Sequence, residues 1–99
     1  MADIYDVVVR HDLGRLSTED LEDIIRNSEE ACNGLALAMK TVGKLAFHSL
    51  NSEECSDHEA RDHLSGLSDL MMYLPRIVSG IQQNLLTAQY EISRRGVQS

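Results

Sequence analysis

Two long stretches of the sequence repeat apolar residues at the spacing of an α-helix. In the first stretch, apolar or small residues recur at alternating steps of four and three, and a second column repeats every seven residues beside them. The main column is Leu21, Ile25, Ser28, Cys32, Leu35, Met39, Val42, Ala46 and Ser49, and the second is Ile24, Ala31, Ala38 and Leu45. Ser17, with Asp20 three residues later, has the form of a capping box. We therefore predict a helix over 18–50.

The second stretch repeats the same design after a polar connection over 51–56. Ser56 with Glu59 three residues later is again a start signal, and Gly96 is a residue typical of the position after a helix. The apolar positions are Ala60, Leu64, Leu67, Met71, Leu74, Val78, Ile81, Leu85, Ala88 and Ile92, widened by Leu70 and Ile77. Their phase continues across Pro75, so we predict one helix over 57–95 that is kinked at Pro75. The alternative is a corner at Pro75, which would give a three-helix bundle.

A short connection makes the two predicted helices antiparallel, so the fold class is an all-α helical hairpin. Each helix begins acidic and ends basic, which complements the helix dipole. The hairpin is expected to bring Glu19, Glu22 and Asp23 near Arg94 and Arg95, and Lys40 and Lys44 near Asp57, Glu59 and Asp62. Each apolar stripe covers three positions in seven, which is wider than a two-stranded seam needs. We therefore predict that two copies associate into a four-helix bundle.

Four glycines interrupt the predicted helices at positions 34, 43, 66 and 80. Each costs about 0.5–1 kcal/mol relative to alanine inside a helix. They are either tolerated in a long, well-packed helix or allow another backbone to approach closely.

The segment before the hairpin is short and rich in β-branched residues. It is too short to form a sheet by itself. We expect it either to lay Ile4, Val7 and Val8 over the helices, or to pair with a partner's sheet edge or with the same arm of a second subunit. The predicted organisation is an N-terminal arm over 1–16, a helical hairpin domain over 17–96 and a tail over 97–99.

Composition narrows the class of protein. The 99 residues allow one domain, and 16 acidic against 9 basic residues give a formal charge of −7, which disfavours direct binding of nucleic acid. No apolar run is long enough for a membrane span, and the acidic N-terminus does not have the pattern of a secretory signal. Cys32 and Cys55 are separated by too long a helical span to form a disulfide, so we expect both thiols to be reduced, in the cytoplasm.

Four potential metal ligands lie around the predicted loop: His48, Cys55, His58 and His63. Their spacing does not form two compact pairs of the kind that bind structural zinc. His58 and His63 each have an acidic residue four positions away, Asp62 and Glu59 respectively, which predicts surface pairs. We assign no metal ligand.

Two pairs of carboxylates, Glu19/Glu22 and Glu59/Asp62, place acids three positions apart on one helix face. This spacing is similar to that of the magnesium-binding acids of all-α nucleotide pyrophosphohydrolases, and the similarity is confined to the spacing. The pairs belong to opposite ends of the hairpin and to first helical turns, where acids are favoured by the helix dipole. No catalytic or cofactor-binding residue is assigned, and no cofactor is expected.

The sequence therefore predicts a small acidic protein-protein interaction or regulatory module that is not an enzyme. Its expected partners are a second copy of itself and another protein. One alternative is an acidic inhibitor or mimic directed at a nucleic-acid-binding protein, suggested by the net charge and by the acid-rich segments 19–30 and 53–62. The other alternative is a metal-dependent all-α hydrolase that uses the two carboxylate pairs.

Overall fold

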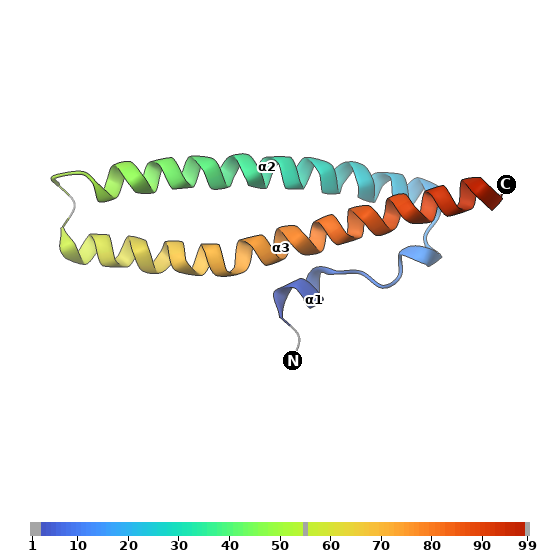
Figure 1. Ribbon diagram of the computed structural model, residues 1–99, viewed down its shortest axis with the longest axis horizontal. Coiled ribbons are helices and arrows are strands. Elements are labelled where there is room, and N and C mark those ends of the chain that lie inside the picture. Colours follow the sequence, from blue (N-terminus) through green and yellow to red (C-terminus); the bar gives the residue numbers. More distant parts are fainter. Residues whose placement is uncertain (1–2, 55, 99) are drawn as a thin grey trace.

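The computed structural model describes residues 3–54 and 56–98, which form an elongated helical hairpin with an N-terminal arm (Figure 1). The elements are the helix α1 (Ile4–Val8), the 3-10 turn η1 (Leu13–Arg15), and the long helices α2 (Thr18–Leu50) and α3 (Asp57–Gln98). These described residues contain no strand. The molecule measures 64 × 29 × 15 Å, so it is long and flat.

Both long helices begin where the capping signals predict. The Ser17 hydroxyl accepts a hydrogen bond from the Asp20 amide at 3.1 Å, and the Ser56 hydroxyl accepts one from the Glu59 amide at 3.1 Å. At the end of α2, the Asn51 side chain donates to the carbonyl of Phe47 at 2.8 Å. The predicted range of 18–50 for the first helix is confirmed.

The second long helix runs without interruption through Pro75. It bends gently near its middle, as a kinked helix should (Figure 1). The continuous-helix prediction is confirmed, and the alternative of a corner at Pro75 is wrong. The predicted end at Arg95 is also wrong, because α3 continues to Gln98. Gly96 ends a helix only if it takes the left-handed conformation, and here its φ is not positive.

The N-terminal arm lies along α3, but its first part is helical rather than extended. The Asp3 side chain accepts from the amides of Tyr5 and Asp6 at 2.8 and 3.4 Å, and the Asp6 side chain accepts from the Asp3 amide at 3.1 Å. This capping box outweighs the β-branched composition of the segment. Ile4 and Val8 are partly buried, as predicted, whereas Val7 is 73% exposed and does not cover the helices.

One buried side chain and one glycine fix the arm to α3. The side-chain oxygen of Asn84 accepts from the Arg10 amide at 2.8 Å, and its amide nitrogen donates to the Val8 carbonyl at 3.1 Å. One turn earlier on α3, a Cβ at Gly80 would lie 2.8 Å from Cγ1 of Val8. Gly80 is therefore the glycine that allows a close approach within the chain. Positions 34, 43 and 66 have no atom within 4 Å of such a Cβ.

Two arginines of α3 attach the remaining parts of the arm. Arg76 forms an ion pair with Asp3 at 2.9 Å and lies over the ring of Tyr5, 4.7 Å from its centroid. Arg95 donates to the carbonyls of Leu16 and Gly14 at 2.7 and 3.3 Å. The arm is thus fastened at both of its ends.

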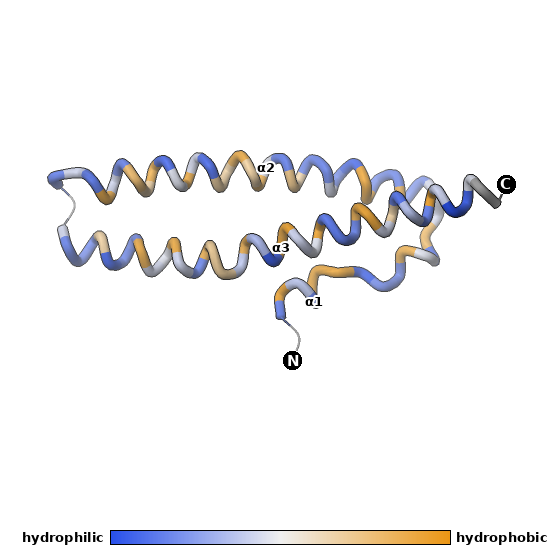
Figure 2. The backbone as a smooth tube through the Cα atoms, in the orientation of Figure 1, coloured by the Kyte–Doolittle hydropathy of each residue, from blue (hydrophilic) through white to orange (hydrophobic). Residues whose placement is uncertain are grey.

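The hydrophobic core lies at one end of the hairpin, where the arm joins it. Leu13 of the arm, Leu21 of α2 and Ala88 of α3 are 1%, 0% and 0% exposed. Partly buried Leu16, Ile24, Ile25 and Ile92 pack around them. We call the end of the hairpin that holds this core the closed end. The opposite end, which carries the loop between α2 and α3, is the open end. Hydrophobic positions continue along both helices to the open end (Figure 2), but none of the described residues there is fully buried.

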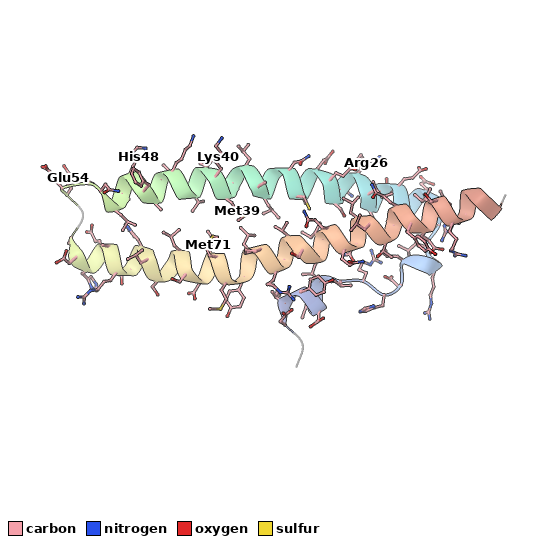
Figure 3. The ribbon with its side chains drawn as sticks, in the orientation of Figure 1. Arg26, Met39, Lys40, His48, Glu54 and Met71 are labelled. Carbon is pink, nitrogen blue, oxygen red and sulfur yellow. The ribbon has the colours of Figure 1, made fainter. Side chains whose placement is uncertain are left out.

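Arg95 lies at the start of α2, as expected, where it donates to the Thr18 hydroxyl at 3.2 Å, but no ion pair joins the two long helices among the described residues. Arg94 and Arg95 pair with Glu91 of their own helix, and Asp23 pairs with Arg26. Within the described part of the chain, Lys40 and Lys44 have no acidic partner. Lys40 projects from the side of α2 that faces away from α3 (Figure 3).

Candidate functional site

An open groove runs between α2 and α3 over the half of the hairpin that the arm does not reach. It has a volume of about 380 Å³. Apolar side chains dominate its lining, which consists of Val42, Leu45, Ala46, Ser49, His63, Gly66, Leu67 and Leu70. We call this the open groove, and all eight of its residues lie on or beside the apolar stripes that the sequence predicts for the two helices.

The open groove is apolar and accessible to solvent. Leu45 is 65% exposed, and neighbouring Leu64 is 53% exposed. Toward the loop, the Ser49 hydroxyl and Nδ1 of His63 lie 3.2 Å apart across the two helices. Met39 and Met71 point toward the space between the helices (Figure 3), yet Met71 remains 58% exposed. Two helices alone do not cover this surface.

The same face of the hairpin continues into the closed end. There a second shallow depression is lined by Ile24, Asn27, Ser28, Ala31, Ile81 and Asn84, together with Arg10 of the arm. Ile24 lies eighteen residues before Val42, and Ile81 lies eighteen residues after His63, which is about five helical turns in each case. The two depressions are therefore parts of one groove face, and the arm borders its closed end.

A different apolar surface lies where α1 meets α3, on the side of α3 away from α2 (Figure 1). A depression of about 520 Å³ there is lined by Asp3, Ile4, Val7, Met72, Tyr73 and Arg76. Met72 and Tyr73 are both exposed. This surface is interrupted by the ion pair between Asp3 and Arg76, so it is more polar than the open groove.

Three acidic residues among those described have a lowered pKa, and all three lie in the arm or at the closed end. The hydrogen bond from Arg76 lowers the pKa of Asp3, the hydrogen bond from Arg10 lowers the pKa of Asp12, and the hydrogen bond from Arg94 lowers the pKa of Glu91. In all three cases the neighbouring arginine favours the ionised form of the acid. None of them lines the open groove.

The structure keeps the two carboxylate pairs apart. Glu19 and Glu22 lie at the start of α2, at the closed end, whereas Glu59 and Asp62 lie at the start of α3, at the open end. Over residues 3–54 and 56–98, no three His, Cys, Asp or Glu side chains are placed to hold a metal ion. One chain therefore does not assemble the site that the hydrolase alternative requires.

The histidines near the loop have separate partners. Nε2 of His58 lies 3.4 Å from the Asp62 carboxylate, as predicted. His63 contacts Ser49 rather than the predicted Glu59, because it faces the groove. The ring of His48 packs edge-on against Phe47, with centroids 5.8 Å apart.

Cys32 is a partly buried free thiol, as expected. Cys55 lies outside the described residues.

The sequence matches no known protein family, and no curated protein or solved structure shows significant similarity to it. Within the described chain, neither long helix combines the length and the apolarity that a membrane span requires.

Proposed function

We propose that this chain is a small protein-interaction module, without catalytic activity, that associates with a second copy of itself through the open groove. The observation that carries the proposal is the exposed apolar stripe at the open end, where Leu45 and Leu64 are more than half accessible. At the closed end, the same face is bordered by the arm. A second copy would supply at the open end the cover that the arm supplies at the closed end.

The exposed area supports a partner of substantial size. A compact monomer of 11.1 kDa exposes about 5,700 Å². This chain exposes 7249 Å². A stable interface of standard size removes about 800 Å² from each partner. The excess is therefore large enough for one such interface on every chain.

Two exposed leucines provide a matched test of the proposal. Leu45 of α2 and Leu86 of α3 are 65% and 59% exposed, but only Leu45 lines the open groove. Leu45→Asp would bury a carboxylate in an apolar interface, twice in a symmetric dimer, and should weaken self-association by about 100-fold or more. Leu86→Asp should change it by less than about threefold, because Leu86 lies at the closed end and single surface substitutions away from a contact have small effects.

Light scattering of both variants at a series of concentrations gives the readout, and circular dichroism checks that each stays helical. Equal dissociation constants for the two variants would remove the open groove from the proposal. A wild-type chain that stays monomeric at high micromolar concentration would refute self-association itself.

A further inference from the structure

We propose that the second copy packs antiparallel, so that the two open grooves face each other and the two loops point in opposite directions. This inference rests on the proposed function and specifies the geometry of the interface. Three features of the chain lead to it: the position of the arm, the distribution of charge and the position of Gly66.

The arm limits where a partner can lie. Asn84 holds the backbone at Val8 and Arg10 beside the closed end of the groove face. The arm thus borders the closed end of the face, and the part that no other segment of the chain borders is the open groove, at residues 42–49 of α2 and 63–70 of α3, where we place the partner. Since Ser49 lies across from His63, the middle of the groove is level with residues 45–46 and 66–67. A two-fold axis that relates two facing grooves passes through this level.

The charge distribution decides between the two orientations. The segment 51–62, which holds the loop and the first turn of α3, carries five acids and one base, whereas 31–50 carries two bases and no acid. Parallel copies would place the two acidic loop segments together, with Glu59 one helical turn from groove-lining His63 in both. Antiparallel copies separate these segments and bring each one level with the basic middle of its partner. Lys40 projects away from α3 (Figure 3), so it does not form a direct ion pair with the partner. The attraction between the acidic segment of one copy and the basic segment of the other is a long-range electrostatic one.

Gly66 permits the close contact that this arrangement needs. It lines the open groove within one residue of the expected axis, and a Cβ at this position would have no atom within 4 Å. The two copies of α3 can therefore cross with their backbones close together at Gly66. Gly80 allows the arm to pack closely on α3, and Gly66 would allow the partner to do the same.

The proposed geometry also bears on the carboxylate pairs. With the axis at this level, Glu59 of the second copy comes level with about residue 38 of α2. That position is about 24 Å along the helix from Glu22. The dimer therefore keeps the two acid pairs apart, and it builds no metal site from them.

Spin labels measure the orientation directly. We would place a label at exposed Glu29, as Glu29→Cys in a chain that also carries Cys32→Ala and Cys55→Ser. Position 29 lies about 25 Å along α2 from the expected axis, so the antiparallel dimer predicts about 50 Å between the two labels. A parallel dimer keeps both labels at one level, about 10–30 Å apart, since only helix widths separate them. The labelled chain is first checked for helicity and for mass.

The outcomes separate the inference from the proposed function. A dimer mass with a distance near 50 Å supports both. A dimer mass with a distance below about 30 Å overturns the antiparallel arrangement and leaves self-association standing. A monomer mass for both the wild-type and the labelled chain, with no dipolar coupling, overturns both.

Discussion

Gly80 is the position where the contact between the arm and α3 is tightest, and Gly80→Ala should reveal that contact. The added methyl would lie 2.8 Å from Cγ1 and 2.9 Å from Cβ of Val8. It would also lie 3.4 Å from the carbonyl oxygen of Tyr5. Ordinary contacts between such atoms are about 3.5–4.0 Å. Because Cβ of Val8 is attached directly to the backbone, the arm itself would have to move.

Two opposing effects set the size of the change. Alanine stabilises a helix by about 0.5–1 kcal/mol relative to glycine. Overpacking in a fixed environment costs about 1–3 kcal/mol. The arm cannot withdraw freely, since Asn84 holds it one turn further along α3. We therefore expect Gly80→Ala to lower the free energy of unfolding by about 1 kcal/mol.

Gly34→Ala is the control, because a Cβ there meets no atom within 4 Å. It should raise the free energy of unfolding by about 0.5–1 kcal/mol through helix propensity alone. Urea unfolding followed by circular dichroism, at one fixed protein concentration, measures both variants. Faster hydrogen exchange at the Arg10 amide in Gly80→Ala would locate the effect in the arm. The reasoning is refuted if Gly80→Ala stabilises the chain as much as Gly34→Ala does.

Three further variants test other parts of the structure. Asn84→Ala removes both hydrogen bonds to the arm and should cost about 1–3 kcal/mol in urea unfolding, whereas exposed Gln83→Ala should stay within about 0.5 kcal/mol of the parent. Pro75→Ala should be as stable as the parent or more stable, because Pro75 already lies inside a helix and alanine restores a backbone donor; a clear loss of stability would contradict this. The lowered pKa of Asp3 means that this acid stabilises the folded chain above its ordinary pKa of 3.8, and that this contribution is lost as the pH falls through the lowered value. The stability difference between the parent and Asp3→Asn should therefore be present near neutral pH and vanish in strong acid, and a difference that persists there would exclude the ion pair with Arg76 as its cause.

The sequence was sufficient to predict the elements whose signals are local. Ser17 and Ser56 each lie three residues before the amide that they cap, so both helix starts could be predicted from short segments. The apolar phase across Pro75 predicted one continuous helix in the same way. A capping box within Asp3–Asp6 was equally local, but the β-branched residues around it favoured an extended segment.

The attachment of the arm could not be predicted, because it depends on contacts between distant parts of the chain. Asn84 contacts Arg10 across a separation of 74 residues, and Arg95 contacts Leu16 across 79. Amphipathic spacing says nothing about which polar side chain will bind a backbone so far away. The width of the apolar stripes did predict that a hairpin alone leaves apolar surface uncovered. The location of that surface at the open end depends on the arm, which packs at the other end.

The mass of the chain in solution tests the central claim most directly. Sedimentation equilibrium of the unmodified protein across micromolar concentrations should give a reversible approach to twice the 11.1 kDa chain mass. That result is expected because association covers exposed Leu45 and the other apolar residues of the open groove. A constant mass of 11.1 kDa up to the highest concentration would contradict the account.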